Sequence, residues 1–423
     1  MPDVLSGGTS GVFLPVSRLR RGQSAARRVY RVAMNCSLTR ALRTNWSAFI
    51  LVVFLAAAAT GCTTAVSSRL ESYRSGALTT RARPVLRRGM NFGDAMEAPN
   101  EGDWGVALSA SDFDEVKAVG FDHVRVPMRV SAHANPRSPF GIEPRFFARI
   151  DWVIEQALSR DLAVIIDVHH YVEMMKAPER HADRFEAIWR QIAMRYRGMP
   201  DGVVFELLNE PTDNLTAEVW NPILKRVFQS VRQIDPQRTI IIEGAHWASA
   251  KDLRDTLWIP EGDAHVVASF HMYAPMYFTH QGFGWMPSHY GTRGVVFPGP
   301  PASPLRASSG ALAFPESREF FTRYNAEPAA TNPSGATSVL EVLDIASAFK
   351  ARTGLPVYLG EFGAGINADT KSRAAWTRLV RSESEKRGFG WGYWDFCHNF
   401  AAYNRALFSG EWIPEIRAAL LDP

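Results

Sequence analysis

Eight short apolar runs, separated by longer segments with helical periodicity, constrain the fold of this 423-residue chain more than any other feature. Continuous apolar runs of this length are typical of parallel strands that are buried on both faces. The runs lie at residues 89–92, 123–128, 163–168, 203–208, 239–244, 266–273, 356–362 and 389–396. Helices are expected between and after them, at 111–119, 145–159, 182–197, 216–234, 337–351, 371–387 and 413–421.

Eight repeats of strand and helix favour one closed α/β barrel, the (β/α)8 TIM barrel, over an open doubly wound sheet. No GxGxxG motif follows the first run, which argues against a dinucleotide-binding sheet. We therefore predict a single barrel domain over residues 88–423. The alternation of strands and helices is interrupted at 291–336, a segment rich in Pro, Gly and Ser. We predict that this segment is a loop insertion, either functional or mobile.

Residues 1–61 have the features of an export signal. Arg40 and Arg43 precede an apolar run at 46–60 that is short for a membrane span and ends in small residues. Met34 is a candidate for the true start, because the Arg-rich segment before it is unusual for a signal. The polar segment at 62–87 is predicted to be a flexible tether.

The four residues "ATGC" resemble a bacterial lipoprotein box, in which Cys62 would be lipidated and become the mature N-terminus. Ala59 stands where such boxes more often have Leu, and an ordinary cleaved signal or an uncleaved anchor is the alternative. We therefore expect an exported protein, anchored to a membrane through Cys62 and facing the periplasm or cell surface, or else secreted. Its oligomeric state is not predicted.

Charge and cysteine content exclude two classes of protein. The net charge is +4, but residues 1–61 contribute eight Arg against Asp3, or +7, so the remainder carries 4 − 7 = −3. This near-neutral remainder does not predict a nucleic-acid-binding surface. The cysteines are Cys36, Cys62 and Cys397. If the signal is cleaved and Cys62 is lipidated, Cys397 is left alone and no internal disulfide can form.

Polar, titratable or aromatic residues lie at or just after the carboxyl end of seven of the eight predicted strands. In a barrel of this type these ends meet at one mouth, where the chemistry takes place. A single strand-end His or Trp is more often structural, but burying a whole set costs several kcal/mol unless its members pair with one another. The set is Asn91 and Glu97, Arg125, His169 and His170, Asn209 and Glu210, His271 and Tyr273, Glu361, and Trp394.

Glu210 and Glu361 follow the fourth and seventh strands, which face each other across a barrel mouth. Two opposed carboxylates suit glycoside hydrolysis, in which one protonates the leaving oxygen and the other attacks the anomeric carbon. Arg125 and Tyr273 are expected to stabilise the charge of Glu361, and Glu210, beside the neutral Asn209, to retain its proton. The Asn209 amide is a candidate donor to a sugar 2-hydroxyl.

Several motifs together resemble glycoside hydrolase family 5, the retaining cellulase family, and within it the bacterial endo-β-1,4-glucanases. The resemblance runs from about Arg88 to about Leu421 and rests on "GMNFGDAMEAPNEGDWG", "HVRVPMR", "VIIDVHHY", "ELLNEP", "SFHMYAPMYFTHQGFGW", "VYLGEFGA" and "GWGYWDF". It implies Glu210 as acid/base and Glu361 as nucleophile. It also implies that Arg125, Asn209, His271 and Tyr273 support catalysis, and that Asn91, Glu97, His169, His170, Trp285 and Trp394 contact the sugar.

The expected function is that of a retaining endo-β-1,4-glycanase acting on cellulose-type or mixed-linked glucan, without cofactor or metal. The partner is then a β-linked polysaccharide or oligosaccharide, with β-mannan as the next choice of substrate. One alternative is a metal-dependent hydrolase that uses His169, His170 and His271. Another is a surface carbohydrate-binding lipoprotein that has lost catalysis, although both glutamates are present.

Overall fold

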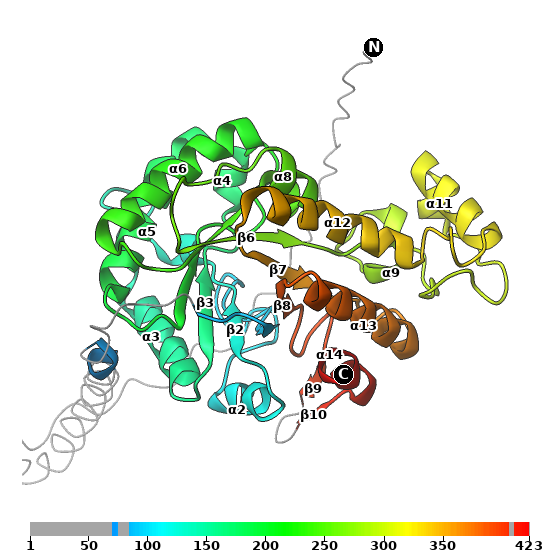
Figure 1. The fold of residues 1–423 in the computed structure, drawn as a ribbon, viewed down its shortest axis with the longest axis horizontal. Helices are drawn as coiled ribbons and strands as arrows, with labels where there is room; N and C mark the ends of the chain where they lie inside the picture. Colours follow the sequence, from blue (N-terminus) through cyan, green and yellow to red (C-terminus); the bar gives the residue numbers. More distant parts are fainter. Residues whose placement is uncertain (1–69, 75–83, 406–409, 423) are drawn as a thin grey trace, which may run out of the picture. The chain divides into compact units, whose positions relative to one another are not determined.

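The computed structural model describes residues 70–74, 84–405 and 410–422, and its centre is a closed barrel of eight parallel strands (Figure 1). Each strand pairs with its neighbours in chain order, and β8 closes the barrel against β1. The strands are β1 (Arg88–Asn91), β2 (His123–Val126), β3 (Ala163–Asp167), β4 (Val203–Glu206), β5 (Ile240–Glu243), β6 (Val266–His271), β7 (Val357–Phe362) and β8 (Gly390–Tyr393). The predicted (β/α)8 barrel is confirmed.

The strands are buried on both faces, as their continuous apolar runs predict. Alternate side chains point into the barrel, where Ile165, Val204 and Ile241 pack together with Val267 and Tyr358. The intervening residues, such as those at 164 and 166, point outward and belong to the larger core beneath the helices. The barrel interior therefore has an apolar floor of its own, separate from the outer core.

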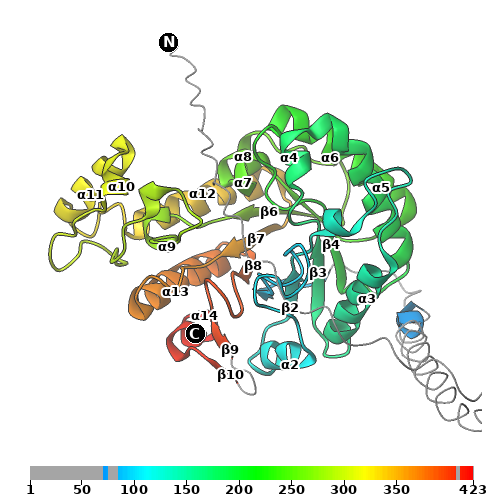
Figure 2. The same ribbon diagram turned by 180° about the vertical axis from the view of Figure 1, so that it is seen from behind.

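Helices surround the barrel (Figures 1 and 2). They are α2 (Ala110–Ala118), α3 (Pro144–Leu158), α4 (Val172–Lys176), α5 (Pro178–Tyr196), α6 (Ala217–Ile234), α7 (Ala245–Ala248), α8 (Ala250–Asp255), α9 (Met276–Thr279), α12 (Ala336–Thr353), α13 (Thr370–Lys386) and α14 (Pro414–Leu421). The predicted helices all occur within a few residues of their expected bounds. After β8, a short hairpin of β9 (Tyr403–Arg405) and β10 (Gly410–Trp412) precedes α14.

The segment at 291–336, predicted as a loop, contains two helices, α10 (Ser309–Leu312) and α11 (Pro315–Ala326). The Pro and Ser residues that indicated a loop are compatible with helix starts, since Pro315 opens α11 and the Ser308 hydroxyl caps α10. Figures 1 and 2 show both helices standing out from the ring, beside α9. Phe320 of α11 stacks on Tyr277 of α9 at 4.1 Å, which fixes the insertion to the loop after β6.

The predicted export signal at 1–61, the alternative start at Met34 and the lipidation site at Cys62 lie outside the described residues. Of the predicted tether at 62–87, the structure describes residues 70–74 and 84–87. Among the helices in the described part of the chain, none is long and apolar enough to cross a membrane. The domain bounds therefore stay a prediction.

Candidate active site

A layer of acidic side chains covers the apolar floor of the barrel at the carboxyl ends of the strands. Asp167, Glu206 and Glu243 are the last residues of β3, β4 and β5. Each lies two positions after a residue of the floor and therefore points into the barrel. All three are at most 1% exposed, so their charges need partners inside the protein.

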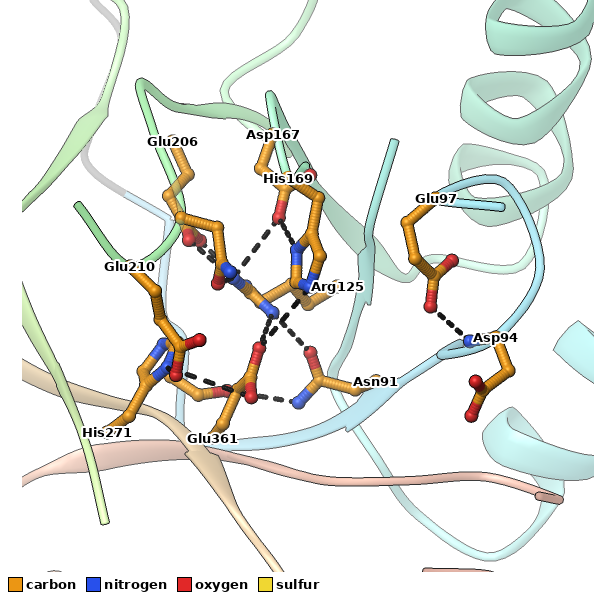
Figure 3. A network of polar contacts seen from close by, with 12 residues as sticks. Asn91, Asp94, Glu97, Arg125, Asp167, His169, Glu206, Glu210, His271 and Glu361 are labelled. Carbon is orange, nitrogen blue, oxygen red and sulfur yellow. Dashed lines mark hydrogen bonds and ion pairs between the residues drawn. The ribbon is translucent and has the colours of Figure 1, made fainter. Parts of the chain in front are cut away.

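Arg125 on β2 is the main partner and lies at the centre of the network in Figure 3. It is fully buried and points inward because it pairs in register with Ile165 of the floor. Its guanidinium donates to both oxygens of Glu206 (2.8 and 2.6 Å), Asn91 Oδ1 (2.9 Å), Asn209 Oδ1 (2.7 Å) and Glu361 Oε1 (2.8 Å), and Nη2 lies 3.1 Å from Asp167 Oδ2. One side chain thus joins four strands of the barrel to the predicted nucleophile.

Glu361 on β7 receives two charge-stabilising hydrogen bonds. Arg125 donates to Oε1, and the Tyr273 hydroxyl donates to Oε2 at 2.7 Å. The carboxylate is nearly buried, with 5% of its side chain exposed. These contacts are the ones predicted to stabilise a negative charge on Glu361.

Glu210 lies after β4 in a backbone conformation that a residue with a side chain seldom adopts, with φ at 48°. The Glu243 carboxylate holds it there, because Oε2 accepts the Glu210 backbone N–H at 2.9 Å. The Glu210 side chain points into the mouth and is 26% exposed. Strained residues of this kind persist where the surrounding structure fixes them, and they cluster at functional sites.

His271 on β6 joins the two glutamates. Its Nδ1 lies 2.8 Å from Glu210 Oε1 and 3.7 Å from Glu361 Oε2, and its Nε2 lies 3.0 Å from Glu243 Oε1. Irregular pairing at His271 on β6, and again next to Glu361 on β7, marks bulges in these strands. Bulges re-aim side chains, which explains why both residues point into one space.

The pKa directions follow from burial and charge. Burial raises the pKa of Glu210, and the hydrogen bond from His271 offsets part of this effect. Burial disfavours a charged His271, but Glu243 and Glu361 hold its pKa well above the ordinary value. Burial likewise opposes the charge of Glu243, yet His271 and Arg125 lower its pKa to about 2. The raised pKa of Glu210 has the predicted direction but another cause, because burial raises it although the cation of His271 lies 2.8 Å away.

Burial disfavours the charged forms of the remaining acids of the layer. Burial raises the pKa of Glu206 to about 8 and that of Asp167 to about 7, against the lowering effect of Arg125. Two cations, Arg125 and His271, thus lie among five carboxyl groups, which favours a proton on at least one of the five. The cluster can carry one protonated and one ionised glutamate at its open face.

Aromatic rings form the walls of the mouth. His169 stacks on Trp394 at 5.6 Å with the rings 5° from parallel, and Asp167 Oδ2 lies 2.8 Å from its Nδ1. Burial lowers the pKa of His169 and brings that of His170 to about 3, so both rings are neutral. The Trp285 side chain is 58% exposed and stacks on Phe283 at 5.3 Å. Exposed tryptophans are suited to stacking against sugar rings.

Two residues that were predicted to contact the sugar form their hydrogen bonds within the protein instead. Asn91 is fully buried, and its amide bonds with Arg125, Gly360 and Tyr393. Glu97 is 1% exposed and accepts the backbone N–H groups of Asp94 and Ala95. In this structure Asn91 positions Arg125, and Glu97 holds the turn after β1.

Asp167, Glu206 and Glu243 were missed by sequence reasoning, because they lie inside runs that read as apolar. A signal was present: an acid closes each of three successive strands, and a lone Arg lies in the strand before them. The metal-hydrolase alternative receives no geometric support. Among the described residues, the groups placed to hold a metal include neither His169 nor His170.

Known proteins resemble this chain over most of the barrel. The family described as "Cellulase (glycosyl hydrolase family 5)" matches residues 85–400. Endoglucanase H of Acetivibrio thermocellus is 30% identical over 341 residues, 79% of this chain and 33% of that protein. Endoglucanase 3 of Fibrobacter succinogenes is 26% identical over 354 residues, 79% of this chain and 53% of that protein. The chain thus spans a third to about half of the length of these relatives.

Solved structures agree with the sequence match. Thermotoga maritima Cel5A in complex with cellobiose is 38% identical, with a TM-score of 0.68 over 79% of this chain and 97% of that one. The same protein in complex with mannotriose gives a TM-score of 0.67 with the same coverage. The matched region includes both glutamates at the mouth of the barrel, and the chain belongs to glycosyl hydrolase family 5.

Proposed function

We propose that this protein is a retaining endo-β-1,4-glycanase that cleaves β-1,4-linked glucan by double displacement. The observation that carries the proposal is the closeness of its two glutamates. One side-chain atom each from Glu210, Glu361 and His271 lies within 4.8 Å of the others. Retaining glycosidases place their two carboxyl groups about 5 to 5.5 Å apart, whereas inverting enzymes need a wider gap for a water molecule.

Glu361 is the proposed nucleophile, because Arg125 and Tyr273 stabilise its ionised form. It attacks the anomeric carbon while Glu210 protonates the leaving oxygen, which gives a covalent glycosyl–enzyme intermediate. Glu210, now ionised, takes a proton from water, and that water releases the sugar from Glu361. His271 stays protonated and stabilises the negative charge on Glu210 between the two steps.

Asn209 binds the sugar in this proposal. Its Oδ1 accepts a hydrogen bond from Arg125, which leaves its NH2 group to donate to the 2-hydroxyl of the sugar under attack. Hydrogen bonds to this hydroxyl strengthen in the transition state. Trp394 and Trp285 supply stacking surfaces for the sugar.

β-1,4-Glucan is the first choice of substrate because the relatives named above are endoglucanases and one solved structure holds cellobiose. β-Mannan is the second choice, since the same Thermotoga protein is also described with mannotriose. We further propose that the protein is exported and attached to a membrane through Cys62, or else secreted. Two features of the sequence support this proposal: the apolar run at 46–60 after Arg40 and Arg43, and the lipoprotein-box-like "ATGC" that ends at Cys62.

The test is a panel of carboxymethylcellulose, mixed-linked glucan and β-mannan, with products sized by chromatography. The proposal expects short oligosaccharides from the glucans and an early loss of viscosity, as internal cleavage produces. Glu361→Ala at wild-type thermal stability should abolish turnover of every substrate. Oligosaccharide release by that variant, or binding of glucan without turnover by the wild-type protein, would refute the assignment.

A further inference from the structure

We propose that Asp94, Asp395 and His398 form a binding site for one divalent transition-metal ion of the zinc type. The site lies in the rim of the barrel and is separate from the carboxylates around Arg125. One side-chain atom from each of the three residues lies within 4.8 Å of the other two. No step of the proposed hydrolysis uses any of them.

The fold brings these residues together from opposite ends of the domain. Asp94 lies in the turn after β1, and Asp395 and His398 follow β8. β1 and β8 are paired neighbours that close the barrel, so the loops at their carboxyl ends are adjacent. Asp94 has a φ of 62°, and its backbone N–H is bound by Glu97, which fixes the turn that presents its carboxylate.

Two atoms of the group are buried without a hydrogen-bond partner among the described residues. Asp395 is fully buried, and its Oδ1 accepts the His398 backbone N–H at 3.0 Å, but its Oδ2 has no partner. His398 Nδ1 is also buried, and it forms a 2.9 Å ion pair with Asp94 Oδ2 that lies outside hydrogen-bond geometry. A buried carboxylate oxygen without a partner costs several kcal/mol, so something must satisfy it.

A metal cation of the zinc type would bind the free Asp395 oxygen, the His398 imidazole and the Asp94 carboxylate at once. Two carboxylate oxygens and one imidazole nitrogen match the ligands that zinc accepts, and a site with three protein ligands leaves a fourth position for water. Calcium fits less well, because it takes six to eight oxygen ligands. The side chains of His398 and Asp94 are 37% and 15% exposed, which gives an ion a route from solvent.

The ion would join the two loops that carry predicted sugar contacts. Asp94 belongs to the turn held by Glu97, and Asp395 directly follows Trp394. A bound ion would hold the Trp394 loop against the β1 turn and add a cross-link to the rim of the barrel. We therefore expect the ion to stabilise the folded protein, since it binds the assembled site and not the unfolded chain.

The test measures zinc bound to the full, untagged chain after treatment with EDTA and addition of ZnCl2. Metal content after gel filtration and binding by titration calorimetry are compared with those of His398→Ala and Asp395→Asn. His246→Ala is the matched control, because His246 forms a 2.9 Å pair with Asp252 on the surface, and no third ligand joins the pair in the described part of the chain. CaCl2 at the same concentration tests the choice of ion.

The proposal expects His398→Ala to retain one zinc ion fewer than wild type and His246→Ala, or to bind it at least about tenfold more weakly. Zinc should raise the melting temperature of wild type and the control but not of His398→Ala, and calcium should not reproduce the effect. If wild type retains no zinc, or if His398→Ala retains as much as wild type, a proton or water fills the site and the proposal is wrong. His398→Ala decides the matter even if Asp395→Asn fails to fold, since the histidine ring is partly exposed.

Discussion

Replacing Arg125 with Lys keeps a positive charge but cannot keep the network that the guanidinium holds. Arg125 makes five side-chain hydrogen bonds, and a lysine ammonium can donate at most three. At least two charge-assisted bonds are therefore lost, each worth about 1.5 to 3 kcal/mol. The free energy of unfolding should fall by about 3 to 6 kcal/mol, as measured by urea denaturation.

Activity should change in a way that stability alone does not explain. When Glu361 loses its guanidinium partner, its carboxylate is held less firmly for attack on the anomeric carbon, so kcat should fall at least about tenfold. The assay is kcat for hydrolysis of an aryl β-cellobioside, at a temperature where the variant is folded.

Arg238→Lys is the matched control for this experiment. Arg238 is also fully buried and donates to Asp235 and to the carbonyl oxygens of Tyr196, Met199, Pro200 and Val203, at the opposite end of the barrel. It should lose comparable stability with an unchanged kcat. The same kcat in Arg125→Lys as in wild type, or an equal loss of kcat in both variants, would refute the role given to Arg125.

Three further predictions concern Glu210 and its support. Glu210→Ala should lose about 10²- to 10⁴-fold in kcat/KM on substrates with poor leaving groups. With dinitrophenyl leaving groups it should retain fast glycosylation, and azide should restore its turnover. Absence of azide rescue would count against the acid/base role of Glu210. Because burial raises the pKa of Glu210 and the acid must be protonated, the alkaline limb of kcat/KM should lie above the ordinary glutamic acid value and disappear in Glu210→Ala. Glu243→Gln removes the negative charge beside His271 and one hydrogen-bond acceptor. We expect kcat to fall at least about tenfold, which is about 1.4 kcal/mol of activation free energy, with little change in KM. An unchanged kcat would show that Glu243 is only structural.

The barrel and its main residues could be predicted from sequence because parallel strands buried on both faces have a simple signature. Arg125, Glu210, His271 and Glu361 interrupt or follow those runs, so the mouth of the barrel could be identified as well. The order of the strands in a barrel was enough to place these four residues at one mouth, although no contact distance was known.

Other features depend on contacts that sequence does not show. Glu206 and Glu243 lie inside runs that read as apolar, and their role depends on which face of the strand they occupy and on a cation supplied by another strand. The bulges that aim His271 and Glu361 have no local sequence marker. Helix α11 was missed because Pro315, read as a loop signal, starts the helix, and its apolar face is matched by Tyr277 far along the chain.

The configuration of the first product tests the central claim most directly. One carboxylate oxygen of Glu210 and one of Glu361 lie within 4.8 Å of each other, which is close to the spacing of retaining enzymes, so we expect the reaction to pass through a covalent intermediate. Proton NMR of a cello-oligosaccharide digest, recorded before mutarotation, should show the β-anomer forming first. An initial α-anomer would mean inversion and would contradict the arrangement of Glu210 and Glu361 proposed for catalysis.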